Sequence, residues 1–117
     1  QFEKLLSETG TTILKFFLHI SKEEQKERFQ DRLDEPDKHW KFSLDDLEKR
    51  KQWEDYMAAY EDALTRCTTS WAPWYVIPAD QKWYRNLAIM RVIVDTVNGL
   101  NPQFPEAEDG LDSVVIE

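Results

Sequence analysis

The sequence predicts an α/β fold, a parallel sheet flanked by helices, in which most of the chain is helical. Two short apolar runs, at residues 12–20 and 74–79, have the length and composition of strands. The continuous apolar centre of the first run is typical of a strand covered on both faces in a parallel sheet. Helical patterns precede, separate and follow the two runs, as in βα units. Because two strands alone make a poorly covered sheet, we expect further strands or a partner chain to cover them.

The opening residues predict a helix. Phe2, Leu5 and Leu6 keep helical spacing. Gly10 stands where a left-handed residue commonly ends a helix, because glycine has no Cβ to clash in that conformation. We therefore expect a first helix that ends shortly before Gly10.

Two capping signals predict the helices that follow the first strand. Ser21 and Glu24 form an S-x-x-E box, so a helix should begin there and run to about Leu33, where an Asp-Glu-Pro sequence breaks it. Ser43 with Asp46 predicts the start of a longer helix. Its apolar positions follow the helical period and are expected to pack: Leu47, Trp53, Tyr56, Met57, Tyr60 and Leu64.

The last predicted helix runs from about Gln81 to Val97. Gly99 is expected to mark its end, and Asn101 followed by Pro102 agrees with a stop at this point. The side chains expected on its inner side are Trp83, Leu87, Met90, Ile93, Val94 and Val97.

Residues 1–101 are predicted to form one compact unit, and residues 102–117 an acidic, flexible tail. Five acids and no bases lie between Glu106 and Glu117, and without them the net charge of −8 becomes −3. This charge argues against a nucleic-acid partner. We interpret the tail as an aid to solubility, with shielding of a basic channel as the alternative.

Neither a membrane span nor a disulfide is predicted. No stretch reaches the ~20 apolar residues that a membrane helix needs, and the first residues lack the charged start and apolar centre of a signal peptide. We therefore expect a cytoplasmic protein with no membrane partner. Cys67, the only cysteine, cannot form an intrachain disulfide and is interpreted as a structural thiol at a helix end.

The two histidines do not predict a metal site. His19 and His39 each lack neighbouring ligands at the spacing of a zinc site. His19, inside the apolar strand, is interpreted as a core histidine with satisfied hydrogen bonds. His39, beside Trp40, is interpreted as a packed or surface residue. No metal ligand is assigned to this chain.

A group of cations is the strongest candidate for binding chemistry. Arg28 and Arg32 are four residues apart and share one face of the predicted helix. Lys38 and Lys41 follow in a connection that Pro36 separates from that helix. Such a group suits a polyanion, because it spreads positive charge along it.

Ordinary surface charge is the alternative for the two arginines. Arg28 stands one helical turn after Glu24 and could pair with it. Arg28 and Arg32 would then be solvated charges on an exposed helix face, with little effect on stability. The spacing alone is compatible with both interpretations.

Four fragments of the chain point to one known family. They are KFFLHISKEEQKERFQDRL (15–33), DEPDKHWKFSLDDLEKRKQWEDYMAAYE (34–61), APWYVIPAD (72–80) and KWYRN (82–86). Together they resemble the C-terminal half of the family-2 polyphosphate kinases, over roughly residues 1–101. The resemblance implies that the fold is the C-terminal part of a P-loop kinase-like fold.

The same resemblance implies two groups of site residues. The sequence RFQDRLDEPDKHWKFS looks like the lid that folds over the polyphosphate chain, at about residues 28–45. It implies phosphate contacts from Arg28, Arg32 and Lys41, and after them from Lys38. In P-loop kinases the loop after the last strand often lies against the nucleotide base. This implies nucleotide contacts from Pro78, Ala79, Asp80, Lys82 and Trp83.

The activity that the resemblance implies is phosphoryl transfer between inorganic polyphosphate and an adenine or guanine nucleotide, such as AMP or ADP. It also implies Mg²⁺ as cofactor and a homo-oligomer. The family's glycine-rich phosphate loop is not in this sequence, whose only glycines are Gly10, Gly99 and Gly110. We therefore expect this chain alone to be catalytically inactive, with no catalytic residue or magnesium ligand of its own.

Two alternatives stay open beside the resemblance. Asp80 could be the N-cap of the last helix rather than a nucleotide contact, since aspartate is a favoured capping residue. The whole chain could also be a non-catalytic interaction module that derives from a kinase-like fold and binds a partner through its aromatic helices.

Overall fold

The computed structural model describes residues 1–117 and confirms the predicted fold class, a small parallel sheet with helices around it. In chain order the elements are α1 (Phe2–Glu8), β1 (Lys15–His19), α2 (Lys22–Asp34), the 3-10 helix η1 (Pro36–Lys41), α3 (Leu44–Arg50), α4 (Trp53–Cys67), β2 (Trp74–Pro78), α5 (Lys82–Leu100) and the 3-10 helix η2 (Leu111–Ser113). Most of the ordered chain is therefore helical.

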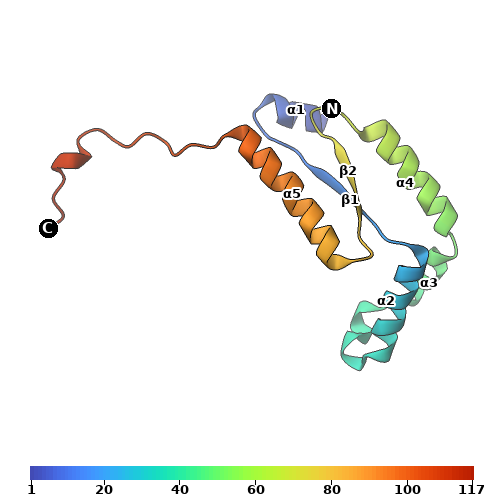
Figure 1. Ribbon diagram of the computed structural model, residues 1–117. Helices are drawn as coiled ribbons and strands as arrows, with labels where there is room; N and C mark the ends of the chain where they lie inside the picture. The colour runs from blue at the N-terminus through green and yellow to red at the C-terminus, as the bar shows by residue number, and fades with distance from the viewer.

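The two strands pair in parallel along their whole length, with Lys15 opposite Trp74. Parallel strands need a long crossover, and α2 to α4 supply it. In Figure 1, α5 lies on one side of the strands and α4 on the other. The Tyr60 ring of α4 lies 4.9 Å from the Phe17 ring of β1, so α4 packs directly on this face of the sheet.

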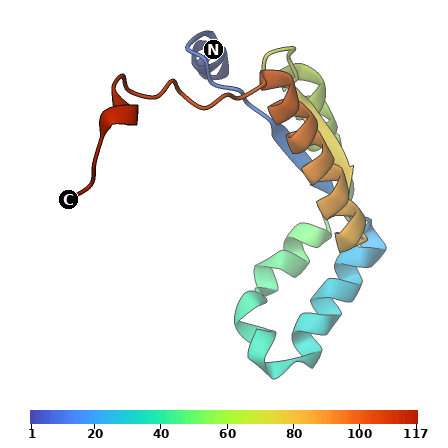
Figure 2. The same cartoon turned by 60° about the vertical axis from the view of Figure 1, so that its left-hand side comes forward.

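A hairpin of α2, η1 and α3 projects from the sheet (Figure 2). Ser21 Oγ accepts a hydrogen bond of 3.1 Å from the Glu24 N–H, as the capping box predicts. Pro36 opens η1, because proline has no N–H to continue α2. The Nε2 N–H of His39 donates to the carbonyl of Leu33 at 2.7 Å and closes the hairpin. This hairpin is the segment that the resemblance assigns to the lid.

The predicted long helix is two helices, α3 and α4. Ser43 caps α3 through a 3.3 Å hydrogen bond from the Asp45 N–H to its Oγ. Arg50 is the last residue of α3 and Trp53 the first of α4. The apolar positions 47 and 53 are six residues apart, which is not a helical repeat of three or four, and the chain breaks between them.

Lys15 joins three elements at the start of β1. Its Nζ donates to Glu3 Oε2 of α1 at 2.9 Å and to the carbonyl of Cys67 in α4 at 3.0 Å. It also lies 5.0 Å from the ring centroid of Trp74 in β2. The ammonium is thus held by a charged, a neutral and an aromatic partner.

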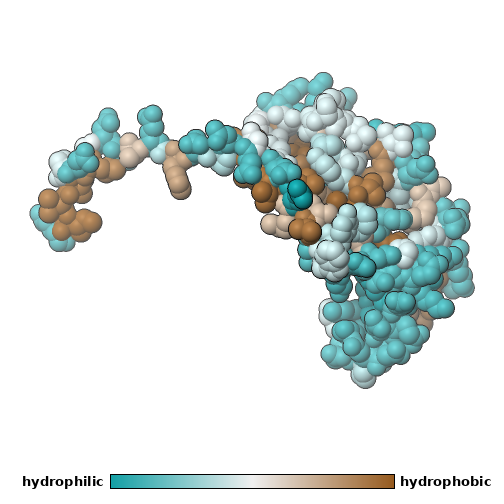
Figure 3. Space-filling model, viewed as in Figure 1, coloured by the Kyte–Doolittle hydropathy of each residue, from teal (hydrophilic) through white to brown (hydrophobic).

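Very little of this chain is buried. Only Ala72, Ile77 and Ala79 are buried, and brown apolar patches remain on the surface around the sheet (Figure 3). The predicted burial of the first strand on both faces is wrong for this chain, since Leu18 is 46% exposed. His19 is likewise exposed, with its ring against Phe17, and is not a core histidine. Two strands cannot cover both faces of their own sheet.

Helix α5 exposes most of the face that was predicted to be its inner side. Trp83 is 65% exposed and Leu87 is 56% exposed, whereas Ile93 is half-buried. The helix is apolar on more than one side, so its periodicity does not decide which side meets the sheet. The predicted inner side chains that are exposed are Trp83, Leu87, Met90, Val94 and Val97.

The chain extends away from the body after α5 (Figures 1 and 2), with η2 as its only ordered turn. Phe104 is 99% exposed and Ile116 94% exposed, so no side chain of the body covers them. The boundary between a unit at 1–101 and a tail at 102–117 stays a prediction. None of the helices combines the length and apolar character needed to cross a membrane.

The two helix ends with a left-handed residue differ from each other. Gly10 follows the end of α1 with φ of 95°, as predicted. At the end of α5 the left-handed residue is Asn101, with φ of 47°, and Gly99 lies inside the helix. The prediction that Gly99 ends this helix is therefore wrong.

We predict opposite effects of alanine at these two glycines, since nothing lies within 4 Å of a Cβ built at either. Gly10→Ala should lower the free energy of unfolding by about 1 kcal/mol, because an L residue is strained at positive φ. Gly99→Ala should raise it by up to about 1 kcal/mol, because alanine favours a helix. Urea unfolding followed by circular dichroism measures both. A loss of stability in Gly99→Ala would contradict the placement of the helix end.

Candidate functional site

A hollow of about 340 Å³ between the projecting hairpin and α5 is lined entirely by polar side chains. Its rim combines residues of α2, η1 and the first turn of α5, which are far apart in sequence. Six of the side chains are cationic and one is acidic: Arg28, Arg32, Lys38, Lys41, Lys82, Arg85 and Asp31. We refer to this hollow as the basic hollow.

Arg28 ties α2 to the loop that follows β2. Its Nε donates to Glu24 Oε1 at 2.9 Å, so the pair considered in the sequence does form. Its Nη2 also donates to the carbonyl of Ala79 at 2.8 Å and to that of Asp80 at 3.3 Å. Arg28 is therefore more than a solvated surface charge, because one guanidinium connects α2 with the loop that was predicted to contact the nucleotide.

A second tie runs in parallel between the same two segments. Asp80 Oδ1 accepts a 2.7 Å hydrogen bond from the N–H of Ser21, the residue that caps α2. This bond takes the place of the reciprocal half of the capping box, because Glu24 is paired with Arg28. The alternative that Asp80 caps α5 is wrong, since the N-cap is Gln81 and has no side-chain hydrogen bond.

Hydrogen bonding from Ser21, first through its backbone N–H, is the main cause that lowers the pKa of Asp80 below its usual range, and the charge of Arg28 acts in the same direction. Asp80 is therefore held as a carboxylate at neutral pH. An acceptor of this kind fixes the loop but cannot donate a proton.

Several cations of the basic hollow have no carboxylate partner. No carboxylate oxygen lies within 4.0 Å of Arg32, Lys41, Lys82 or Arg85, whereas Lys38 is paired with Glu35. The hydrogen bond to Glu35 raises the pKa of Lys38 above its usual value. Unpaired like charges that face one hollow repel each other, so an anion bound there is stabilised by all of them.

Aromatic rings support two of these cations. The guanidinium of Arg32 lies 5.7 Å from the ring centroid of Phe29, and Lys41 Nζ lies 5.2 Å from that of Trp40. Such contacts orient a cation without neutralising its charge. Both side chains therefore stay available to a negatively charged ligand.

The residues predicted to contact the nucleotide are not all in one place. Pro78 and Asp80 line a smaller hollow of about 210 Å³ together with Gln81 and Tyr84. Ala79 is buried and offers its carbonyl to Arg28. Lys82 belongs to the basic hollow, and the exposed Trp83 lines neither hollow, with its ring edge-on to Tyr84 at 5.8 Å.

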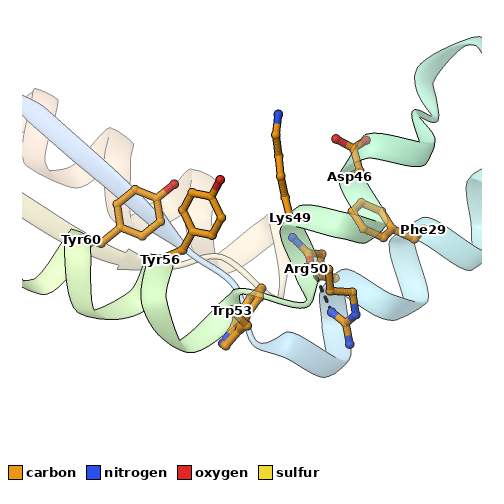
Figure 4. Close-up of a pocket in the computed structure, with 8 residues that line it drawn as sticks. Phe29, Asp46, Lys49, Arg50, Trp53, Tyr56 and Tyr60 are labelled. Atoms are coloured by element: carbon orange, nitrogen blue, oxygen red, sulfur yellow. Dashed lines mark hydrogen bonds between the residues drawn. The ribbon is translucent and has the colours of Figure 1, made fainter.

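A third hollow, of about 360 Å³, lies between α2, α3 and α4, and the sequence did not predict it. Figure 4 shows the rings of Tyr56 and Tyr60 side by side on α4. Arg50 Nη1 donates to the carbonyl of Lys22 at 2.8 Å and to Gln25 Oε1 at 3.0 Å. The Arg50 guanidinium is thus occupied in joining α3 to α2.

Comparison with known proteins decides which family has this arrangement. The family model of polyphosphate kinase 2 matches residues 1–105. The chain belongs to the polyphosphate kinase 2 family. The resemblance inferred from the four sequence fragments is thereby confirmed, and it extends over the projecting hairpin, the sheet and α5.

Two relatives and one solved structure show how much of this polyphosphate kinase 2 chain is shared. The AMP/ADP-polyphosphate phosphotransferase of Meiothermus ruber is 52% identical over 117 residues, which are 100% of this chain and 44% of that protein. An uncharacterized protein in the chlN 3′ region of Leptolyngbya boryana is 48% identical over 108 residues, 92% of this chain and 79% of that protein. The crystal structure of polyphosphate kinase 2 from Arthrobacter aurescens TC1 is 46% identical, with a TM-score of 0.91.

The match to the Arthrobacter structure covers 96% of this chain and 40% of that one. The chain thus spans less than half the length of the Meiothermus relative and of this structure. The fold of this polyphosphate kinase 2 chain is that of the solved family member over almost all its residues.

Sequence reasoning missed one cation of the basic hollow, Arg85. The available signal was its position three residues after Lys82, which places both on one face of α5. The quoted fragment KWYRN contains both residues, but only the first was assigned a ligand contact.

The chain brings no group of three or more His, Cys, Asp or Glu side chains together in a way that could hold a metal ion. The side chains present therefore do not fit a Mg²⁺ site by themselves, because magnesium in kinases is held by carboxylates together with substrate phosphates. We assign no magnesium ligand to this chain.

We predict that Asp80 makes the fold sensitive to acid. Its pKa is lowered in the folded state, so its contribution to stability is complete above the unfolded pKa of 3.8 and is lost as the pH falls through the folded pKa. Asp80→Asn should lose this contribution at neutral pH and flatten the acid limb of stability against pH. Urea unfolding between about pH 6 and about pH 2.5 measures it.

Asp95→Asn, at an exposed carboxylate of α5 without a hydrogen-bond partner, is the matched control. It should keep the acid limb of the unchanged chain. An Asp80→Asn variant with that same limb would mean that the bond to Ser21 does not form in solution.

Proposed function

We propose that this chain is the lid-bearing part of a polyphosphate-dependent nucleotide kinase, which transfers a phosphoryl group between inorganic polyphosphate and AMP or ADP. The observation that carries the proposal is the basic hollow, in which six cations face one space and four of them have no carboxylate partner. The name of the Meiothermus relative, an AMP/ADP-polyphosphate phosphotransferase, supports the choice of substrates.

The hollow suits a phosphate chain better than a single small anion. Its cations come from two walls, the lid hairpin and the first turn of α5, so a ligand must span the space between them to meet all of them. Polyphosphate carries charge at every unit along its length and can do so. In phosphoryl transfer such cations spread the charge that develops on the transferred group.

Arg28 has a positioning role in this proposal. It holds the middle of α2 against the carbonyls of Ala79 and Asp80, and so fixes the distance between the phosphate-binding hairpin and the nucleotide loop. Correct spacing of the two substrates is the larger part of catalysis in kinases, because the protein forms no covalent bond to the phosphoryl group.

The proposal includes Mg²⁺, a homo-oligomer and a cytoplasmic site of action, where the nucleotide substrates occur. The exposed apolar face of α5 supports an assembly, because large apolar patches usually meet another surface. The glycine-rich phosphate loop and the magnesium ligands are not among these residues. The chain alone therefore transfers no phosphate, although its basic hollow binds polyphosphate.

A non-catalytic interaction module is the second candidate. The observation in its favour is the Leptolyngbya relative, of which this chain covers 79%, so a protein little longer than the matched part exists. The module would use the apolar surface around the sheet, whereas the kinase would use the basic hollow. Binding of polyphosphate to the hollow separates the two.

We predict that Arg28→Ala/Arg32→Ala/Lys41→Ala lowers polyphosphate affinity by about 100-fold or more, since Arg32 and Lys41 each lose a charge-assisted hydrogen bond and the hairpin loses the Arg28 tie that positions it. Calorimetry at low and moderate salt measures it. Arg32→Ala/Lys41→Ala, which leaves the Arg28 tie intact, should show most of the loss. The control Lys26→Ala/Lys51→Ala/Arg91→Ala removes the same charge from exposed positions outside the hollow and should bind nearly as the unchanged chain does.

We also predict that phosphoryl transfer requires a phosphate loop in the same protein. The chain alone should form no ATP from ADP and polyphosphate. A chimera, in which the chain replaces its counterpart in the Meiothermus relative, should form ATP. The substitutions Arg32→Ala/Lys41→Ala should lower the kcat/KM of this chimera for polyphosphate. Transfer by the chain alone would refute the assignment of the missing chemistry.

A further inference from the structure

Lys82 and Arg85 give the basic hollow a second wall. They are three residues apart on α5, so both side chains leave the same face of the helix, at its first turn. The remaining four cations stand opposite, on the lid hairpin: Arg28, Arg32, Lys38 and Lys41. A ligand in the hollow therefore lies between the lid hairpin and α5, which are far apart along the chain.

Arg85 has few partners of its own for a half-buried cation. Its Nε donates to the side-chain oxygen of the neighbouring Asn86 at 3.1 Å, and this is its only side-chain hydrogen bond. Arg28 and Arg50, by contrast, each bond a backbone carbonyl of a distant segment. A guanidinium presents five donors in a planar fork that matches phosphate, so Arg85 keeps most of its binding capacity free.

The helix end beside Arg85 is also unusually positive. The first turns of α2, α3 and α4 all contain acidic residues, whereas that of α5 contains none, and its N-cap Gln81 makes no side-chain hydrogen bond. Unpaired N–H groups and the helix dipole add to the charges of Lys82 and Arg85. The N-terminus of α5 therefore favours binding of an anion beside Lys82 and Arg85. Without these two cations it would not indicate a binding site.

We propose that Arg85, with Lys82, binds the phosphate chain from the α5 side, so that polyphosphate is held between α5 and the lid hairpin. The inference rests on the proposed function and adds to it Arg85, which the family resemblance did not assign. It also assigns Lys82 to the phosphate chain in place of the nucleotide. The ligand class is a linear oligophosphate.

This arrangement predicts that affinity depends on the length of the phosphate chain. A single phosphate can meet one wall of the hollow, whereas a chain of several phosphates meets both at once and gains from each. Loss of the α5 wall should therefore weaken long polyphosphate more than inorganic phosphate. The lid-side substitutions should have the same length dependence.

The test compares Arg85→Gln with Arg91→Gln, an exposed arginine of the same helix outside the hollow. The full chain is titrated calorimetrically with long-chain polyphosphate, tripolyphosphate and inorganic phosphate at several salt concentrations. Arg85→Gln should weaken long-chain polyphosphate about tenfold and make the salt dependence shallower, because one fewer cation meets the polyanion. Arg91→Gln should change neither, and Arg85→Lys should recover most of the affinity.

Each outcome separates the inference from the function it rests on. If Arg85→Gln binds like Arg91→Gln while Arg32→Gln loses affinity, the α5 wall is refuted and the proposed function stands. If the unchanged chain binds no polyphosphate, both fall. Circular dichroism of the variants identifies a loss of helix, and a weakened Arg85→Gln that Arg85→Lys does not rescue would also count against phosphate binding by this charge.

Discussion

The guanidinium of Arg28 is the contact on which the arrangement of the site depends. It lies where three segments meet, the capped start of α2, the end of β2 and the first turn of α5, and it bonds to the first two of them. The hairpin projects away from the sheet (Figure 2), and the bond from the Ser21 N–H to Asp80 is its other tie to the segment after β2. Without this tie, only the bond between Ser21 and Asp80 would set the separation of the hairpin cations from the α5 cations.

The tie depends on several hydrogen bonds around the first turn of α2. A serine cap starts α2, an acidic residue one turn later aligns Arg28, and the carboxylate of Asp80 accepts a hydrogen bond from the N–H of the capping serine. The bonds within α2 are common local motifs, whereas the bond from Ser21 to Asp80 joins residues 59 positions apart. Bonds to charged groups that share one network polarise each other, so the loss of one weakens the rest.

Local signals were predictable from the sequence, and distant contacts were not. The cap at Ser21 and the left-handed Gly10 depend on neighbours within a few residues, and both are present in the structure. The contact of Arg28 with Ala79 joins residues 51 positions apart, and no spacing rule reports it. The prediction of the inner face of α5 was wrong for a related reason. Which apolar face of this helix is covered depends on the elements that pack on it. The family resemblance implied phosphate contacts from the hairpin and nucleotide contacts from the loop, but it did not predict the bond between them.

The extended segment after α5 also affects how this molecule behaves in solution. The radius of gyration is 21.8 Å and the long dimension 69 Å, whereas a compact domain of this length has a radius of gyration of about 13 Å. An elongated chain diffuses slowly for its mass, so gel filtration calibrated with compact proteins would report too large a particle. The number of chains in an assembly of this protein therefore has to come from light scattering or sedimentation equilibrium, which report mass independently of shape.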